Sequence, residues 1–365
     1  MVDFEAVTSR TTFDGASAFK AMLRAFNIAE ASFRDELSES YYAFAGRTVR
    51  FRIVGLELAR QINRPFSHLQ TSGISADPDL EIDLWDESRT AIRFPNPLAD
   101  GNAGWSEVTG TSSDQRFVGQ RLPNTLTCLD RLAKHIVGSI AWSDRIFIYE
   151  RAKPLSRLLL EWHNDSNVQI IHAGMVAHEG RGVLFAGKSG SGKSTSSLAC
   201  LCGGFSFLSE DYLGLEILTD GSLLGHSLYN SVFLESKHLK RFPDLKAHVL
   251  RGGPAEEKSV VILSDLFPER LNRVAPITAV LLPRVVIGGT ESRIYPAPKS
   301  QALLALGPSS LFQIPSRRTN GFEKLAQIVQ QVPAYWLDLG GEIDRIPHVV
   351  KAFMEEMASR ELASA

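Results

Sequence analysis

The sequence predicts an α/β protein of two domains, a larger α/β domain over residues 151–365 and a smaller mixed α+β domain over 1–150. Three observations predict this. A chain of 365 residues, 44% of them hydrophobic, is longer than one compact core usually organises. Apolar and polar residues alternate in "YYAFAGRTVRFRIVG" (41–55), as in a half-buried strand. Later, the apolar "GVLFA" (182–186) leads through a glycine-rich turn into the helix-like "STSSLACLCGG" (194–204), the order of an α/β unit.

In the N-terminal part, residues 1 to about 40 favour helix, and "DLEIDLWDES" (79–88) repeats the strand pattern of 41–55. The polar stretch 99–115, rich in Gly and Ser, predicts a loop. "WSDRIFIYERAKPLSRLLLEWHN" (142–164) then predicts a strand running into a helix, with Pro154 at the start of that helix. A domain boundary is expected near residue 150.

In the C-terminal part, short apolar runs separated by turn residues predict strands, and longer periodic runs predict helices. The expected strands lie near 182–186, 205–208, 212–218, 223–228, 259–263 and 279–282, and the expected helices near 193–203, 321–331 and 344–358.

Composition narrows the class of protein. The formal charge is −2 and basic residues are scattered, so neither a nucleic acid nor a membrane surface is expected as a partner. The N-terminus lacks the pattern of a signal peptide, and the most apolar segment, "ITAVLLPRVVIGG", is short and interrupted by Pro283 and Arg284. The three cysteines, Cys128, Cys200 and Cys202, have no zinc-binding spacing and are expected to be core thiols. A cytoplasmic protein follows as the expectation.

The turn "GKSGSGKST" (187–195) fits the pattern G-x-x-x-x-G-K-[ST], between a strand and a helix as that pattern requires. Glycines allow backbone N–H groups to turn toward phosphate oxygens, and the helix directs its positive end at the same anion. The lysine would reach the β- and γ-phosphates of ATP, and the following serine hydroxyl would bind Mg²⁺. A turn without a ligand is the alternative. The nucleotide-binding candidates are Gly187, Lys188, Ser189, Gly190, Ser191, Gly192, Lys193, Ser194 and Thr195.

The acidic pair Glu210–Asp211 follows this loop closely. About ten residues of helix descend roughly 15 Å, and about five residues of strand climb back roughly 16 Å. A right-handed crossover would therefore end the second strand at the same sheet edge as the first, next to the loop. One carboxylate could complete the Mg²⁺ shell while the other accepts a proton from an attacking hydroxyl. The alternative is an exposed acidic turn.

With these residues, "IHAGMVAHEGRGVLFAGKSGSGKSTSSLACLCGGFSFLSED" (171–211) resembles the HPr kinase/phosphorylase superfamily. His172 matches the family's upstream histidine, Lys193 and Ser194 its phosphate loop, and Glu210–Asp211 its paired acids. The resemblance implies a P-loop-containing, HPr kinase/carboxykinase-like C-terminal domain. Glu210 stands where the family has Asp, and the family's Arg-Gly-Leu-Gly signature has no good counterpart. The N-terminal part resembles the shorter relatives that include lasso-peptide serine kinases.

The sequence therefore predicts a kinase that uses ATP and Mg²⁺ to phosphorylate a hydroxyl of a peptide, protein or small molecule. Its expected catalytic residues are Glu210, Asp211, His172 and Lys193, and its expected metal ligands are Ser194 and Asp211. A non-catalytic ATP-binding regulatory module, a simple ATPase and a carboxykinase-like reaction stay open as alternatives. The N-terminal domain is expected to recognise the acceptor, and a homo-oligomer is left open. Arg251, Lys258 and Glu235 could add charge near the phosphates, although a solvated surface position is the preferred interpretation of each.

Overall fold

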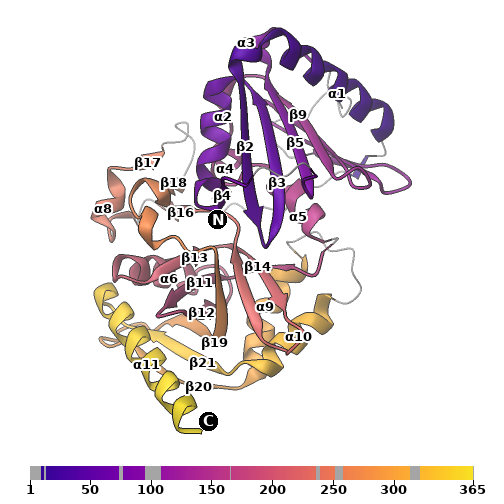
Figure 1. Cartoon of the computed structure of the whole chain (residues 1–365). Helices are drawn as coiled ribbons and strands as arrows, with labels where there is room; N and C mark the ends of the chain where they lie inside the picture. The colour runs from indigo at the N-terminus through magenta and orange to yellow at the C-terminus, as the bar shows by residue number, and fades with distance from the viewer. Residues whose placement is uncertain are drawn as a thin grey trace. The chain divides into compact units, whose positions relative to one another are not determined.

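The computed structural model describes residues 10–11, 14–73, 77–94, 108–164, 166–235, 239–250, 258–312 and 321–364. The chain divides into two compact units, Met1–Trp162 and His163–Ala365 (Figure 1). The expected boundary near residue 150 falls inside helix α4 (Ile148–Ala152), and this division counts α4 and nearly all of α5 (Ser156–His163) with the first unit.

The N-terminal unit is built on one mixed sheet. Strands β3, β5 and β9 are parallel at its centre, and hairpins extend it on both sides. In order across the sheet, the strands are β1 (Arg10–Thr11), β6 (Val108–Thr111), β7 (Phe117–Leu122), β8 (Thr125–Asp130), β9 (His135–Ile140), β5 (Leu80–Asp86), β3 (Arg47–Val54), β2 (Leu37–Phe44) and β4 (Gln70–Thr71). The strand character predicted at 41–55 and 79–88 is confirmed by β2, β3 and β5.

Helix α1 (Gly15–Ser32) covers part of this sheet, and the sequence explains both its start and its buried face. The carboxylate of Asp14 accepts a hydrogen bond from the Ser17 backbone N–H at 3.0 Å, which caps the helix. Phe19, Met22 and Phe26 recur at helical spacing and are buried in a cluster with residues of the sheet. Two further helices, α2 (Leu56–Asn63) and α3 (Glu87–Thr90), complete the unit with α4 and α5.

Two expectations for this unit were wrong in part. The strand expected at the start of 142–164 is a 3₁₀ turn (Ser143–Arg145) followed by α4. Ile148 and Ala152, four residues apart, are both buried, which suits one face of a helix. The loop expected at 99–115 contains strand β6, which pairs with β7, while residues 99–107 lie outside the described ranges.

The C-terminal unit contains a second mixed sheet, and the glycine-rich turn follows one of its strands. In order, its strands are β10 (Gln169–His172), β14 (Tyr212–Ile217), β15 (Leu223–Ser227), β19 (Val274–Val285), β12 (Arg181–Phe185), β11 (Gly174–His178) and β13 (Ser206–Ser209), with β21 (Ala334–Leu339) paired to β19 and to β20 (Arg293–Ala297). A separate small sheet comprises β16 (Ser231–Glu235), β18 (Lys258–Ile262) and β17 (Val249–Leu250), near α8 (Pro243–Lys246).

Strands β12 and β13 are both antiparallel to β11, which lies between them. They are therefore parallel to each other, and their carboxyl ends meet the same edge of the sheet. This confirms the prediction that the chain, after α6, returns toward the sheet edge at which β12 ends. The intervening strand β11, with the short sequence "GMVAH", was not predicted.

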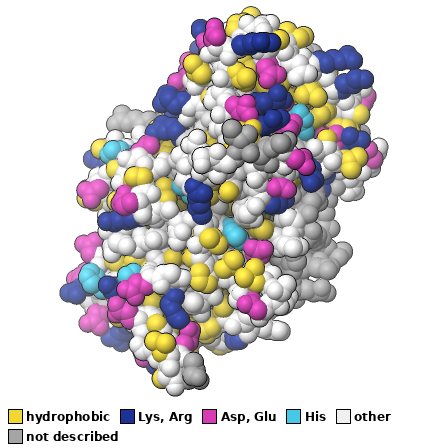
Figure 2. Space-filling model, viewed as in Figure 1, with side chains coloured by type: hydrophobic (Ala, Val, Ile, Leu, Met, Phe, Trp, Pro, Cys, Tyr) yellow, Lys and Arg dark blue, Asp and Glu magenta, His cyan; other side chains and the backbone are white. Residues whose placement is uncertain are grey.

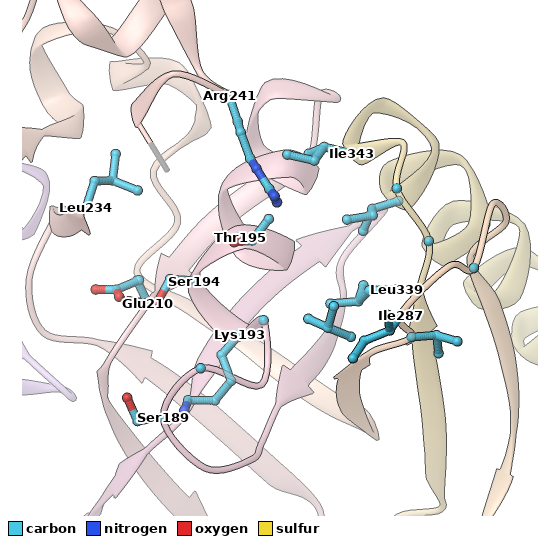
Figure 3. Close-up of a pocket in the computed structure, with 18 of the residues that line it drawn as sticks. Ser189, Lys193, Ser194, Thr195, Glu210, Leu234, Arg241, Ile287, Leu339 and Ile343 are labelled. Carbon is cyan, nitrogen blue, oxygen red and sulfur yellow. Dashed lines mark hydrogen bonds between the residues drawn. The ribbon is translucent and has the colours of Figure 1, made fainter. Parts of the chain in front are cut away.

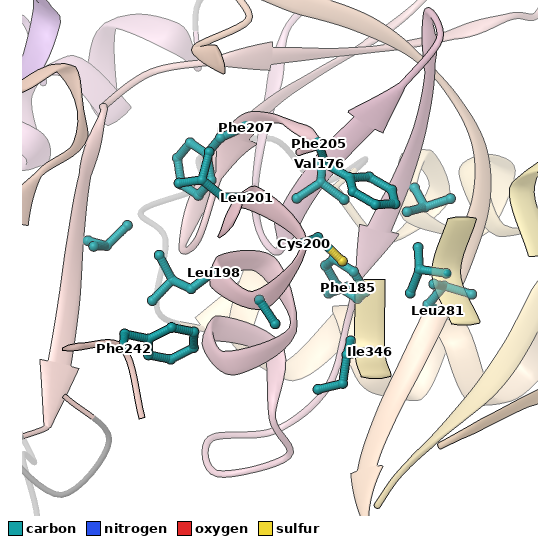
Figure 4. Close-up of a cluster of buried hydrophobic side chains, with 14 of the residues drawn as sticks. Val176, Phe185, Leu198, Cys200, Leu201, Phe205, Phe207, Phe242, Leu281 and Ile346 are labelled. Carbon is teal, nitrogen blue, oxygen red and sulfur yellow. The ribbon is translucent and has the colours of Figure 1, made fainter. Parts of the chain in front are cut away.

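Both faces of this sheet are buried by helices. Helices α6 (Lys193–Cys202) and α11 (Ile346–Ser364) cover one face, and α9 (Lys299–Phe312) and α10 (Gly321–Gln331) cover the other (Figure 1). On the α6 face, Leu198, Cys200 and Leu201 pack among aromatic side chains such as Phe185 and Phe207 (Figure 4). This core fixes where α6 begins, and thus where the turn before it lies.

The strands and helices predicted for the C-terminal part are confirmed, with shifts of a few residues at their ends except that β19 and α11 are longer. Strands β10, β11, β16, β17, β20 and β21 and helices α8 and α9 were not predicted. Of the three expected core thiols, Cys128 and Cys200 are buried, as predicted, and Cys202 is exposed. Cys202 is the last residue of α6 and comes directly after the buried residues of that helix.

Positive and negative side chains are interspersed on the face drawn in Figure 2. Among the described helices, none is both long and apolar enough to cross a bilayer.

Candidate active site

The glycine-rich turn leaves β12 and enters α6 in a conformation that glycine favours. Gly190 and Gly192 have φ of +78° and +109°, in the left-handed region. A Cβ added to Gly192 would lie 2.3 Å from the Cδ1 atom of Leu339, so a side chain at this position would have to displace the end of the Leu339 side chain. The Ser196 N–H donates to the Gly192 carbonyl at 2.8 Å, which begins the helix directly after the turn.

Lys193 holds its ammonium group over this turn. Its Nζ atom donates to the carbonyl oxygens of Gly187 at 2.6 Å and Lys188 at 3.3 Å. The side chain is 7% exposed. Burial lowers the pKa of Lys193 below its usual value, and the carboxylates of Asp211 and Glu210 act in the opposite direction. A cation with little solvent around it attracts an incoming anion strongly.

Glu210 lies at the carboxyl end of β13 and contacts the first turn of α6. The Ser194 hydroxyl donates to its Oε1 atom at 2.5 Å, and the residue is 8% exposed. The arrangement places a hydroxyl and a buried carboxylate together as oxygen ligands.

Asp211 faces the end of β10. Its Oδ1 atom lies 2.7 Å from Nε2 of His172. The Asp211 N–H donates to the Ser209 hydroxyl at 3.1 Å, and the Asp211 carbonyl accepts from the Ala173 N–H at 2.9 Å. These backbone bonds hold the carboxylate beside the imidazole. The expected alternative of an exposed acidic turn does not describe either acid, since Glu210 is buried and the Asp211 side chain is 23% exposed.

The side chains of Lys193, Ser194, Glu210, Asp211 and His172 border one cavity of about 790 Å³. In Figure 3, Glu210 lies on one side of Ser194, and Leu339 and Ile287 lie on the other. Its lining comprises His172, Ser189, Gly190, Gly192, Lys193, Ser194, Thr195, Glu210, Asp211, Phe233, Leu234, Arg241, Val285, Val286, Ile287, Gly288, Gly289, Leu339, Gly340, Gly341, Ile343 and Ile346. The end of the cavity at Leu339 and Ile287 is thus apolar, whereas the end at Glu210 holds charged groups together with Leu234.

The structure brings His172, Lys193, Ser194, Glu210 and Asp211 together around this cavity, as the sequence suggested. Of the other expected nucleotide-binding residues, Ser189, Gly190, Gly192 and Thr195 line it as well. Gly187, Lys188 and Ser191 are in the turn and do not line it. Arg251 and the side chains of Lys258 and Glu235 lie outside what the structure describes.

Sequence reasoning missed Arg241 and the apolar end of the cavity. The side chain of Arg241 points into the cavity near Thr195 (Figure 3). The only sequence signal for the apolar end was the run "VVIGG" (285–289), in which three apolar residues precede two glycines after a strand.

Within the described residues, no group of three or more His, Cys, Asp or Glu side chains is placed to hold a metal ion. The Ser194 hydroxyl and the Glu210 carboxylate nevertheless fit Mg²⁺, which takes oxygen ligands, keeps several waters and commonly needs few protein ligands beside phosphates.

Comparisons with known proteins say little about the function of this site. The sequence matches no family model and no curated protein. Among solved structures, the chain is similar to the Hpr(Ser) kinase/phosphatase from Coxiella burnetii, with 12% identity and a TM-score of 0.29, over 52% of this chain and 99% of that one.

Proposed function

We propose that this protein is a P-loop kinase that transfers the γ-phosphoryl group of ATP to a hydroxyl, with Mg²⁺. The observation that carries the proposal is the placement of two carboxylates, Glu210 and Asp211, on the same cavity as Lys193 and the glycine-rich turn. A cavity of about 790 Å³ is large enough for a nucleotide together with part of an acceptor.

The turn would bind the phosphates through its backbone N–H groups and through Lys193. In the structure the Lys193 ammonium donates to the Gly187 carbonyl. Phosphate oxygens would replace that carbonyl as the acceptor, and a buried cation gains more from this exchange than an exposed one.

Mg²⁺ would offset negative charge on the β- and γ-phosphates. Ser194 and Asp211 were the expected ligands. The hydrogen bond between Ser194 and Glu210 favours Glu210 as the carboxylate that shares the ion with Ser194. Asp211 then remains available for proton transfer.

Asp211 would accept the proton of the acceptor hydroxyl. The hydroxyl oxygen forms a bond to the γ-phosphorus as the bond from that phosphorus to the β–γ bridging oxygen breaks, and ADP leaves. His172, 2.7 Å from Asp211, orients the carboxylate and stabilises it through a hydrogen bond. Both residues contribute to positioning, which together with electrostatic stabilisation is the main task of a protein in this chemistry, and Asp211 also accepts the proton.

Arg241 supplies a second positive charge. It points into the cavity near Thr195 and would contact the phosphate chain (Figure 3). The sequence offered Arg251 and Lys258 as candidates for this role, with a solvated surface position as the preferred alternative for each.

The acceptor is a hydroxyl-bearing peptide, protein or small molecule, and we assign its recognition to the N-terminal unit. Removing residues 1–162 tests this, because unchanged acceptor preference in the remaining unit would contradict it.

The proposed reaction is tested by incubating the protein with ATP, Mg²⁺ and a library of serine-containing peptides, or with small polyols. A phosphorylated product detected by mass spectrometry supports the kinase. Phosphate release without a phosphorylated product would indicate an ATPase. Binding of ATP with neither outcome would indicate a regulatory module.

A further inference from the structure

The apolar end of the cavity is formed by a turn that exposes apolar side chains. Val285, Val286 and Ile287 are 63%, 39% and 99% exposed. They are consecutive, beginning with Val285 at the end of β19, and all three line the cavity. A contiguous exposed apolar run inside a concave site is typical of a ligand-binding surface, whereas isolated exposed apolar residues are common.

The turn is held in one place by hydrogen bonds. The Gly289 N–H donates to the Val286 carbonyl at 3.1 Å, and Gly288 at the third position has φ of +76°, as a type II turn requires. Ile287 therefore occupies the tip of a defined turn.

Strand β21 anchors this turn from the other side. The Val286 N–H donates to the Leu339 carbonyl at 3.2 Å, and the Gly341 N–H donates to the Gly289 carbonyl at 3.1 Å. A Cβ on Gly340 would lie 2.7 Å from the Thr290 carbonyl oxygen, so the two segments approach as closely as glycine permits. The exposure of Ile287 thus belongs to a preformed surface.

Leu339 connects this surface with the glycine-rich turn. Its Cδ1 atom lies where a side chain on Gly192 would be, so the apolar wall begins directly beside the last glycine before Lys193. In Figure 3, Ile287 and Leu339 lie on the side of Lys193 away from Glu210. A ligand with phosphates on the turn can extend along this wall without crossing the side that holds the two acids.

We propose that the wall formed by Val285, Val286, Ile287 and Leu339 binds the nucleobase of the nucleotide, while the opposite side of the cavity, at Glu210 and His172, receives the acceptor. The inference rests on the proposed function, since it assumes that a nucleotide's phosphates bind the glycine-rich turn. These four side chains offer no hydrogen-bonding group, so the base is held by apolar contact with its planar face.

The test compares two probes that share a phosphate chain, ATP and inorganic tripolyphosphate, each with Mg²⁺ and the full-length protein in calorimetric titrations. Ile287→Ser is expected to weaken ATP binding by about tenfold, because apolar contact area with the base is lost. Its affinity for tripolyphosphate is expected to equal that of the unaltered protein. Ile287→Leu keeps the apolar contact and should bind ATP within about twofold of the unaltered protein.

Val274→Ser is the matched control. Val274 is 41% exposed at the opposite end of β19 and does not line the cavity, so it should change neither affinity. Equal ATP binding by Ile287→Ser and the unaltered protein would overturn the inference and leave the kinase proposal standing. An equal loss for both probes would also overturn it, because the phosphates rather than the base would then be affected. An unaltered protein that binds neither probe would overturn both proposals.

Discussion

Replacing Asp211 with Asn isolates proton transfer from nucleotide binding. The amide has nearly the shape of the carboxylate and can still accept a hydrogen bond from His172, 2.7 Å away in the structure. It cannot accept a proton from an attacking hydroxyl. The Ser194 hydroxyl donates to Glu210, which is the proposed carboxylate partner of Ser194 at the ion. The substitution should therefore slow phosphoryl transfer and leave the binding of MgATP largely intact.

The expected size of the effect follows from this division of roles. A positioned general base contributes about 10²- to 10⁴-fold, or roughly 3–5 kcal/mol of transition-state stabilisation. MgATP affinity should stay the same or rise slightly, because one negative charge near the phosphates is removed. Single-turnover transfer to a phosphorylatable peptide measures the rate, and calorimetry measures the affinity.

Two other variants complete this comparison. Glu210→Gln should weaken MgATP binding, since its carboxylate is the proposed partner of Ser194 at the ion. Asp220→Asn is the control, because Asp220 caps an exposed turn with Ser222 outside the cavity. The reasoning fails if Asp211→Asn transfers phosphate at the normal rate, or if it loses MgATP binding while Glu210→Gln retains it.

Three further changes test other parts of the site and its support. Burial lowers the pKa of Lys193, so the affinity for ATP should fall as the pH rises toward 10.5. The fall should reach about tenfold once the amine is neutral. Lys193→Arg should abolish this fall when ATP binding is titrated at graded pH. Arg241→Ala should reduce the transfer rate by about tenfold or more, and an unchanged rate would remove Arg241 from the proposed site. Leu198→Ala, in the fully buried core under α6, should lower the free energy of unfolding by about 2–5 kcal/mol in urea titrations, whereas Leu304→Ala at a 66% exposed position should change it by less than about 0.5 kcal/mol.

The glycine-rich turn and the strand and helix beside it could be predicted from the sequence, because their conformations depend on residues close together in the chain. Left-handed φ values at Gly190 and Gly192, and the helix that begins at Lys193, are local properties of the backbone. The nearness of Glu210 to Ser194 was also predictable, since the lengths of one helix and one strand determine where the chain returns.

Two predictions from local sequence patterns were wrong because tertiary packing determines the structure at those positions. Residues 142–149 carry apolar residues at spacings that suit a strand as well as a helix, and only the burial of Ile148 with Ala152 resolves the choice. Cys202 follows two buried residues of α6 and yet is exposed, because the helix ends there.

The sequence by itself determined the glycine-rich turn, the acidic pair and the strand–turn–helix order that joins them. Only the tertiary structure decided that β11 lies between β12 and β13, that His172 contacts Asp211, and that Ile287 and Leu339 form the apolar end of the same cavity. The physical reason is separation along the chain. Leu339 touches the Gly192 region across a long intervening stretch of sequence, and such contacts depend on sheet order and core packing, which no local residue pattern specifies.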